Sequence, residues 1–514
     1  MLCRHCTLMF EDVDQQMEEA KEDEKSFSNC TSLEQLLVAV ADKCYICSNI
    51  FNQLEDENAI DRLKSHEPPL LLRRGWRNAL TSEVGATILR NVQLDDIPTG
   101  VTEWQYRLIR ASQQDDRFGF DFKPASPEGT KAVHRLYQDI PFSTCSDQAA
   151  ALTRRWYQNC RNGHDKCRDT LPWMAEGTAM SAGVRYGMVE PNGASATRWY
   201  PPRLLDVSAD VIRLLSRRQI QQCPPFAALS HCWGLIPFLT LTSSNIQRFE
   251  SEGIEYATLP ENFRNVVDVC RWLHIRYLWI DSLCIIQQGP GSKADWDENI
   301  DGMRYIYSSC DICISTAATD GDTKSCFVER DPTTIAAVCV MTDDTPNLLI
   351  GMDHSIRGFR NAPIASRAWV LQERLLSRRI LTFGPKQVFW ECCETAGRNV
   401  CETFPQGLPP YGYSRGPFLL PSPKEYGRPE TPSVANHRKW LDLIETYCEC
   451  NLTKRHEDKL VALGGIAQQM QSVFGGSTYI AGFFMFELPA ALLCKRSSMY
   501  EMHVRQTLTL YIYL

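Results

Sequence analysis

The chain has 514 residues, of which 44% are hydrophobic and 23% charged, and its formal net charge is -8. These values are ordinary for a globular protein, and the length is enough for two to four domains. The acidic balance argues against a nucleic-acid partner, because nucleic-acid-binding proteins usually present a basic face.

The N-terminus, MLCRHCTLMFEDVDQQ, lacks the basic segment and apolar run of a secretory signal. We therefore expect the 22 cysteines to be reduced thiols in a cytosolic or nuclear protein, with the cytoplasm as the predicted location. The longest apolar stretch, residues 479–494, is too short for a bilayer and contains Glu487. No membrane span is expected.

Two sets of residues in the first 170 positions have the spacing of metal ligands. Four thiolates in two Cys-x-x-Cys pairs suit a tetrahedral zinc ion, and the predicted structural zinc ligands are Cys3, Cys6, Cys44 and Cys47. The alternative is a cysteine-rich core without metal. A second metal-like set follows a predicted helix over residues 146–160 and consists of Cys160, His164 and Cys167.

An alternation of strands and helices begins at residue 226. Nearly continuous apolar strands are predicted at FAALS (226–230), YLWID (277–281) and CDICISTAA (310–318), and amphipathic helices lie between them. The helix after TLPEN is predicted to start with a capping box of Thr258 and Glu261. This pattern predicts a parallel sheet covered by helices on both faces, with YLWID and CDICIST as neighbouring central strands.

The remaining composition divides the chain into four expected regions. Residues 1–195 form a Cys-rich α+β region, and residues 196–400 form the α/β domain, with its core at 226–395. Residues 401–433 are a Pro/Gly-rich linker, and residues 434–514 are a helical C-terminal region.

Polar residues follow the predicted strands where an open parallel sheet binds ligands, beyond the carboxyl ends of its strands. The three groups are Ser230–Gly234, then Asp281, Ser282, Cys284 and Gln287, and finally Ser366, Arg367, Trp369, Gln372 and Glu373. Each has a structural alternative. Trp233 and Trp369 are also typical core residues, Asp281 suits a helix N-cap, and Glu373 suits an ion pair with Arg367 or Arg374.

A Cys–His catalytic pair is a rival interpretation of the first group. His231 and Cys232 are adjacent, so on an extended chain they point in opposite directions and cannot act together as base and nucleophile. A pairing of Cys284 with His231 in space stays open.

FAALSHCWG, WIDSLCIIQ and SRAWVLQERLLSRRILTF resemble the fungal heterokaryon incompatibility (HET) domain, in the order of the family, over about residues 226–395. The resemblance implies self/non-self recognition between fused hyphae, a form of innate immunity, and programmed cell death. It implies self-association or another incompatibility protein as partner. The chain departs from the family at Asn299, where an acid is usual.

The HET domain is in turn similar in fold to Toll/interleukin-receptor (TIR) domains, some of which hydrolyse NAD. This similarity implies a TIR-like, flavodoxin-like parallel sheet. In those enzymes a serine and a tryptophan precede the catalytic glutamate, and Ser366, Trp369 and Glu373 follow that order. A carboxylate stabilises the oxocarbenium-like transition state of glycosidic cleavage.

With NAD as the expected substrate, Glu373 is the predicted catalytic residue, and the predicted substrate-binding residues are Ser230, Trp233, Asp281, Ser282, Arg367 and Trp369. The alternative function is a non-enzymatic death-signalling module that works by self-association.

Overall fold

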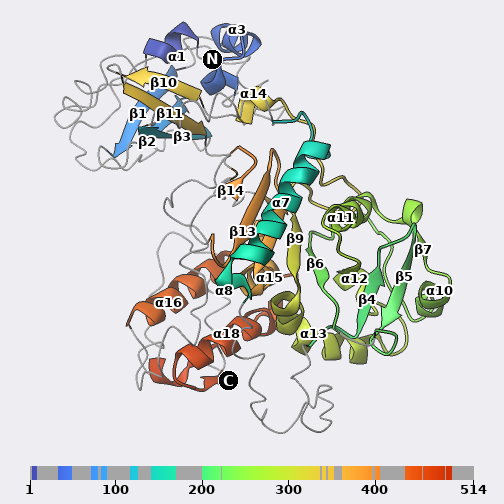
Figure 1. Cartoon of the computed structure of the whole chain (residues 1–514). Coiled ribbons are helices and arrows are strands. Elements are labelled where there is room, and N and C mark those ends of the chain that lie inside the picture. Colours follow the sequence, from blue (N-terminus) through green and yellow to red (C-terminus); the bar gives the residue numbers. More distant parts are fainter. Residues whose placement is uncertain are drawn as a thin grey trace. The chain divides into compact units, whose positions relative to one another are not determined.

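The structure is a computed structural model of the chain (Figure 1). It describes residues 3–8, 33–48, 71–78, 83–89, 116–124, 140–168, 199–220, 223–335, 338–342, 345–351, 362–395, 400–403, 405, 434–453, 455–480 and 482–488. Most of the expected linker at 401–433 and the last part of the expected C-terminal region lie outside the described residues. The boundaries at 195, 400 and 433 stay predictions. Contacts divide the chain into two compact units, each described by itself.

Unit 1 comprises residues 1–149, 328–359 and 401–406. Its described strands form an antiparallel sheet in the order β1-β2-β3-β11-β10, and its described helices are short. The elements are α1 (Arg4–Leu8), α3 (Leu33–Ala41), β1 (Leu71–Asn78), β2 (Glu83–Leu89), β3 (Asp116–Pro124), α14 (Pro332–Ile335), β10 (Val338–Thr342) and β11 (Thr345–Gly351). A Cys-rich α+β region is therefore present at the N-terminus, as predicted.

The three segments of unit 1 are held together by hydrogen bonds over long sequence separations. Strand β11 pairs with β3, with Leu349 opposite Phe122. The buried Arg330 guanidinium donates through Nη2 to Glu402 Oε1 (2.8 Å). The hairpin β10–β11 thus completes a sheet begun more than two hundred residues earlier in the chain.

Unit 2 comprises residues 150–327, 360–400 and 407–514 and contains a mixed sheet. Its described strands are β4 (Arg203–Asp206), β5 (Val211–Ser216), β6 (Phe226–Ser230), β7 (Ile254–Glu255), β8 (Tyr277–Trp279), β9 (Ile312–Thr316), β12 (Arg379–Phe383) and β13 (Val388–Cys392). Strand β14 (Val400–Cys401) pairs at one end of the sheet, where the chain passes between the units. All residues of β6, β9, β12 and β13 are buried, which fits the continuous apolar runs in the sequence.

The centre of this sheet is parallel, in the order β8-β6-β9-β12, and antiparallel strands flank it on both sides. The predicted adjacency of YLWID and CDICIST is wrong, because β6 lies between β8 and β9 and pairs with both. Apolar periodicity identifies a central strand, but it carries no information about which strand is its neighbour. The order of the strands depends on which face each crossover helix covers.

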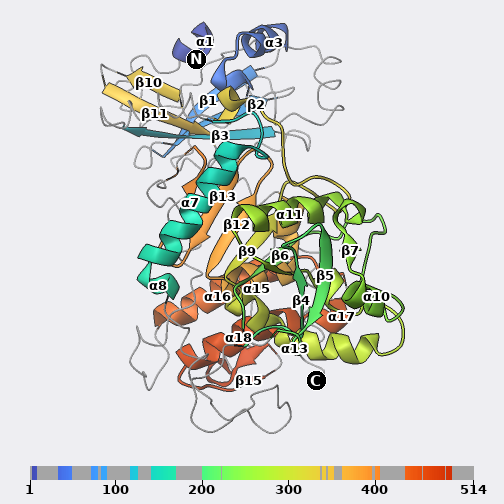
Figure 2. The same ribbon diagram turned by 45° about the vertical axis from the view of Figure 1, so that its right-hand side comes forward.

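Helices cover both faces of the sheet. Crossovers between parallel strands are almost always right-handed, and with this strand order they place α11 (Glu261–Trp272) on one face and α13 (Ser292–Ser309) and α15 (Ala368–Leu376), which contact each other, on the other. Helix α7 (Asp147–Gly163), predicted from the sequence, lies beside α11, because Arg154 Nε donates to the carbonyl of Trp272 (2.7 Å). Figures 1 and 2 show α7 running along the sheet in front of β13.

The described part of the C-terminal region of unit 2, up to residue 488, is mainly helical. It contains α16 (Val434–Glu449), α17 (Arg455–Asp458) and α18 (Val461–Val473), followed by η7 (Met485–Glu487) and the small hairpin β15 (Tyr479–Ile480) and β16 (Phe483–Phe484). Helix α18 packs against both α13 and α15. The C-terminal helices therefore form part of the layer over this face of the sheet.

The remaining short elements of unit 2 are α8 (Asp165–Arg168), α10 (Ile246–Ser251), η2 (Tyr256–Thr258), α12 (Asp281–Cys284) and η5 (Pro363–Ser366). The predicted capping box before α11 is wrong. Pro260 is the N-cap residue, and the Thr258 hydroxyl instead donates to the carbonyl of Glu255 (2.8 Å). Thr258 ends the 3-10 turn η2, so its hydroxyl bonds back within that turn.

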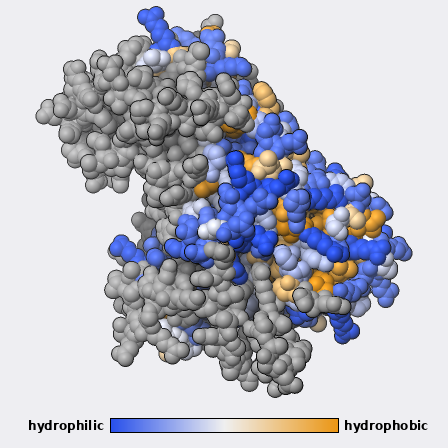
Figure 3. Space-filling model, viewed as in Figure 1, coloured by the Kyte–Doolittle hydropathy of each residue, from blue (hydrophilic) through white to orange (hydrophobic). Residues whose placement is uncertain are grey.

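In the part of the chain that the structure describes, no helix combines the length and apolarity needed to cross a bilayer. The face seen in Figure 3 is largely hydrophilic where residues are described, with small hydrophobic areas between the polar ones. Scattered apolar residues of this kind are normal on a protein surface.

Candidate functional site at the carboxyl ends of the parallel strands

His231 forms the centre of a buried polar network just beyond β6. Its Nδ1 bonds to Asp322 Oδ1 (2.6 Å), and its Nε2 bonds to Asp281 Oδ1 (2.8 Å). The His231 side chain is 2% exposed and that of Asp322 0%, whereas the Asp281 side chain is 27% exposed. An imidazole with carboxylates on both nitrogens must carry a proton on each, so the arrangement favours the imidazolium form.

The electrostatics of the network agree with this geometry. Burial by itself would lower the pKa of His231, but the charges of Asp322 and Asp281 outweigh it and raise the pKa to about 10. Burial would likewise raise the pKa of Asp281, but His231 and the Trp233 N–H hold it below its ordinary value. At neutral pH His231 is therefore an imidazolium, bonded to the Asp281 carboxylate.

Three strand ends bring these residues together. His231 follows β6, Asp281 follows β8, and Asp322 lies on the loop after β9. The loops after β6 and β9 touch at two glycines. Gly234 has a φ of +72°, and a Cβ on it would lie 2.8 Å from the Cα of Gly321. Only glycine at position 234 allows both this backbone conformation and this close approach.

Glu373 lies next to this network, on the helix α15. It is 8% exposed, and its Oε2 has no hydrogen-bond partner among the described residues. Burial raises its pKa above the ordinary value, and a hydrogen bond with Ser230 and the positive charges of Arg367 and His231 oppose that shift. Glu373 is thus a buried carboxylate with an unused acceptor, close to both positive groups.

The predicted ion pairs of Glu373 do not form in the structure. Arg374 pairs with Glu391 (3.0 Å) instead. Arg367 Nη1 donates to the carbonyl of His231, so it bridges the start of α15 to the loop after β6. Arg367 acts on Glu373 through its charge, but no hydrogen-bonded ion pair between the two is found among the described residues.

Other predicted site residues lie around Asp281. The Trp233 indole donates through Nε1 to Asp281 Oδ2 (3.0 Å), and its ring is half-buried. The backbone N–H of Ser282 donates to Asp281 Oδ1 (2.6 Å), and the Ser282 side chain is completely buried. Ser230, Trp233, Asp281, Ser282, Arg367 and Glu373 are therefore brought together, while their roles stay predictions.

The Trp369 side chain points away from the His231 network. Its Nε1 donates to Asp458 Oδ2 (3.2 Å) on α17, and its ring packs against the hydrophobic core formed by α15, α16 and α18. The Ser366 hydroxyl donates to the carbonyl of Pro363 (2.8 Å). The contacts of Trp369 are those of a core residue, and the contact of Ser366 is that of a local turn. Neither residue has a described hydrogen bond to the His231 network.

A Cys284–His231 pair is not formed. Both ring nitrogens of His231 are bonded to aspartates, and Cys284 is buried with its pKa raised by burial to about 12. A thiol of this kind stays protonated and is a poor nucleophile.

Asp322 and Asn262 are the members that sequence reasoning missed. Asn262 Nδ2 donates to Asp322 Oδ1 (3.0 Å), which holds the carboxylate against His231. The rule that selected Ser230 and Asp281 applied equally to TDGD, residues 319–322, beyond the strand CDICIST. Asn262 lies on α11 and carried no such signal.

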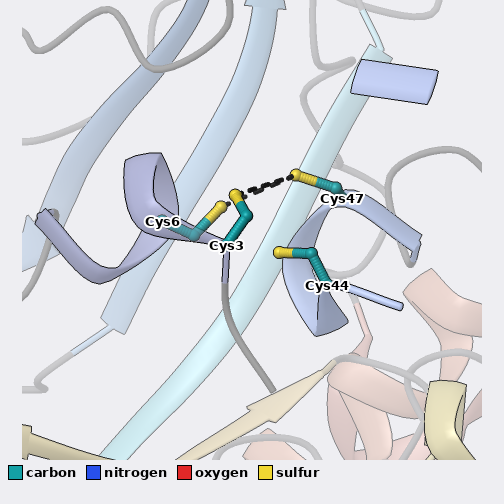
Figure 4. Close-up of side chains that lie close together, drawn as sticks. All are labelled: Cys3, Cys6, Cys44 and Cys47. Carbon is teal, nitrogen blue, oxygen red and sulfur yellow. Dashed lines mark hydrogen bonds between the residues drawn. The ribbon is translucent and has the colours of Figure 1, made fainter. Parts of the chain in front are cut away.

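The four predicted zinc ligands of unit 1 converge (Figure 4). The sulfurs of Cys3, Cys6, Cys44 and Cys47 lie within 4.8 Å of one another. Cys47 Sγ lies 3.9 Å from Cys3 Sγ and 3.6 Å from Cys6 Sγ. Zinc–sulfur bonds of about 2.3 Å place tetrahedral sulfurs about 3.8 Å apart, and these two separations are close to that value.

Comparison with known protein families assigns the α/β core. The family model described as "Heterokaryon incompatibility protein (HET)" matches residues 226–373. The chain carries a HET domain. The matched segment of the HET domain includes His231, Asp281, Asp322 and Glu373, so the whole network belongs to it. No match was found among curated proteins or among solved structures.

Proposed function

We propose that this chain acts in heterokaryon incompatibility as an enzyme that cleaves NAD, with Glu373 as its catalytic carboxylate. The HET domain gives the chain a role related to heterokaryon incompatibility. The observation that carries the proposed chemistry is the buried Glu373 carboxylate, whose Oε2 is unpaired among the described residues beside Ser230 and the His231 network. A buried acceptor without a partner is costly unless a ligand uses it.

The position of the network supports a ligand site. Counted along the chain, the parallel strands β6, β8, β9 and β12 are arranged 2-1-3-4, which is the order of flavodoxin-like sheets. In such sheets the strand order reverses between the first and third strands, and ligands bind beyond the carboxyl ends there. Ser230 ends β6, His231 follows it, and Asp322 follows β9, and these are the two strands on either side of that point. This order also favours the TIR-like fold.

The charges suit nicotinamide–ribose cleavage. The leaving nicotinamide is neutral, so no general acid is required, and the positive charge that develops on the ribose needs a fixed negative group. Glu373 would supply that group, and the partly exposed Asp281 carboxylate would accept hydrogen bonds from ribose hydroxyls. The imidazolium of His231 fixes Asp281 in place and does not exchange protons with substrate.

A non-enzymatic module that signals death by self-association is the second candidate. The network satisfies most of its own hydrogen bonds, as a structural element would, since both Asp281 oxygens already have protein donors. Directly after Trp233 the chain also exposes two apolar side chains, Leu235 (102%) and Ile236 (59%). Such residues are suited to contact with another protein.

Nicotinamide release from NAD by the purified full-length protein separates the two candidates. We expect Glu373→Gln to reduce the rate by about a hundredfold, the usual effect of losing one electrostatic contact to a transition state. Glu391→Gln is the matched control, because Glu391 is also a buried glutamate, but it lies on β13 and pairs with Arg374. If Glu373→Gln still kills cells while their NAD remains intact, the interaction module is the right interpretation.

We further propose that Cys3, Cys6, Cys44 and Cys47 hold a structural zinc ion in unit 1. The convergence of four sulfurs within 4.8 Å of one another, two of their separations being 3.6 and 3.9 Å, supports this proposal. The site would join α1 to the segment after α3 and so fix the N-terminal segment in a region with few long helices.

A further inference from the structure

Unit 2 contains a second cluster of metal-ligand side chains, which belongs neither to the His231 network nor to the N-terminal cysteines. The ligand atoms of Cys160, His164, Cys167 and Cys392 lie within 4.8 Å of one another. The three cysteines are completely buried, and His164 is half-buried. His164 Nδ1 lies 3.3 Å from Cys392 Sγ. The spacing of the first three residues suggested a metal set, but its fourth member is more than two hundred residues away.

Three elements position these side chains. Cys160 lies in the last turn of α7, and the chain continues in helical bonding, with His164 N donating to the Cys160 carbonyl (3.2 Å). Cys160 and His164 therefore share a helix face. Cys167 lies in α8, and Cys392 is the last residue of β13. Helix α7 packs on β13 here, with the rings of Trp156 and Trp390 6.5 Å apart.

The surroundings are suited to a negatively charged metal–thiolate centre. The buried Arg379 donates through Nε to Cys160 Sγ (3.1 Å) and through Nη2 to the Cys167 carbonyl (3.1 Å). Cys392 Sγ also lies 3.2 Å from the Thr395 hydroxyl. Donors directed at sulfur stabilise thiolates and orient them, as outer partners do in metal sites.

We propose that Cys160, His164, Cys167 and Cys392 bind a structural Zn²⁺ ion. Three cysteine sulfurs and one imidazole nitrogen form a tetrahedral set of a type that structural zinc uses. Binding releases three thiol protons and leaves one net negative charge at the centre, which the Arg379 guanidinium compensates. With all four positions filled by protein, the site leaves none open for a substrate, so its role is structural.

The zinc would fasten the end of α7 and α8 to the end of β13. These segments are joined otherwise by packing and by the contacts of Arg379, which bonds also to Asp311 Oδ1 (3.3 Å). Zinc binds the assembled site and not the unfolded chain, so its binding free energy is added to the stability of the fold. We therefore expect it to hold α7 on its face of the HET-domain sheet.

Zinc content per chain tests this proposal on the full-length protein purified under reducing conditions. The double variant Cys160→Ser/Cys392→Ser is expected to hold one zinc ion fewer per chain than wild type. Cys270→Ser is the matched control, because Cys270 is also a completely buried cysteine of unit 2 but belongs to neither group of converging metal-ligand side chains. Equal zinc in the double variant and the control overturns the proposal, as does a disulfide among the four residues in freshly isolated protein.

A second variant covers the case in which the double variant does not fold. His164→Cys keeps four ligands and changes the set from three thiolates to four. With Co²⁺ in place of zinc, it should retain the metal and show stronger thiolate-to-cobalt absorption than wild type. An unchanged cobalt spectrum in folded His164→Cys protein contradicts the assignment.

Discussion

His231 is held by carboxylates on both ring nitrogens, and this limits what it can do. An imidazolium with a pKa of about 10 is a poor general base at neutral pH, although histidine is often that base in enzymes. Its chemistry is that of a fixed cation, which lowers the pKa of Asp281 and is hydrogen-bonded to the buried Asp322. Any reaction at this site must therefore depend on another group, and Glu373 is the candidate.

The raised pKa of His231 predicts how stability changes with pH. Because the folded-state pKa lies above the unfolded value near 6.5, the stabilisation is complete below pH 6.5 and is lost as pH rises through about 10. We expect the free energy of unfolding to fall by on the order of a few kcal/mol over this window. Urea unfolding of the wild-type and His231→Gln proteins between pH 6 and pH 10 measures this fall in the free energy of unfolding.

The variant serves as the control, since other groups that titrate in this range are common to both proteins. His231→Gln should be less stable at neutral pH, because two buried carboxylates lose their cation, and its stability should vary less with pH. Parallel curves for the two proteins would contradict the assigned charge state.

At the level of elements, α18 approaches its neighbours through one of two adjacent glycines. A Cβ on Gly465 would lie 2.8 Å from Gln372 Oε1 on α15 and 2.9 Å from Arg304 Cβ on α13, whereas a Cβ on Gly464 would meet nothing within 4 Å. Gly465 is therefore required for close packing of the three helices. Gly464 is a residue of low helix propensity with no packing role among the described residues.

This difference predicts opposite effects of the same substitution at adjacent positions. Gly465→Ala should destabilise unit 2 by about 1–3 kcal/mol, because the added methyl group overpacks the contact. Gly464→Ala should stabilise it by about 0.5–1 kcal/mol through helix propensity. Thermal unfolding of the two variants and the wild type measures both changes in stability. Equal shifts of the melting temperature in the two variants would show that α18 does not pack on α13 and α15 as described.

At the scale of the whole molecule, the two units are interleaved along the chain. Residues 328–359 fall within the segment that matches the HET family, yet they belong to unit 1, where β11 pairs with β3. Neither unit is a continuous segment, so cutting the chain at a single position would remove strands from unit 1 or residues from unit 2. Experiments on either unit therefore need the full chain.

The proposed zinc in unit 1 predicts a second, separate change in metal content. Cys44→Ser/Cys47→Ser should lower zinc by one ion per chain and lower the thermal stability of unit 1, because structural zinc contributes folding free energy directly. Cys145→Ser, at an exposed cysteine outside both clusters, is the control. Zinc content equal to that of the control would leave the four converging sulfurs as a reduced thiol cluster.

The sequence by itself determined the features that depend on local pattern. Continuous apolar runs identified β6, β8 and β9, and polar residues after them located Ser230, His231 and Asp281, because the period and ends of strands are written in neighbouring residues. Two Cys-x-x-Cys pairs likewise identified four sulfurs that converge. The three motifs FAALSHCWG, WIDSLCIIQ and SRAWVLQERLLSRRILTF, in this order, were sufficient to recognise the HET domain.

Only the tertiary structure decided the features that depend on distant segments. It placed β6 between β8 and β9, paired β11 with β3, and directed Trp369 to Asp458 and away from the network. It also added Asp322 to His231, and Cys392 to a set more than two hundred residues earlier. Such contacts arise from the burial of whole elements against one another, and a local pattern records that an element is buried but not against what.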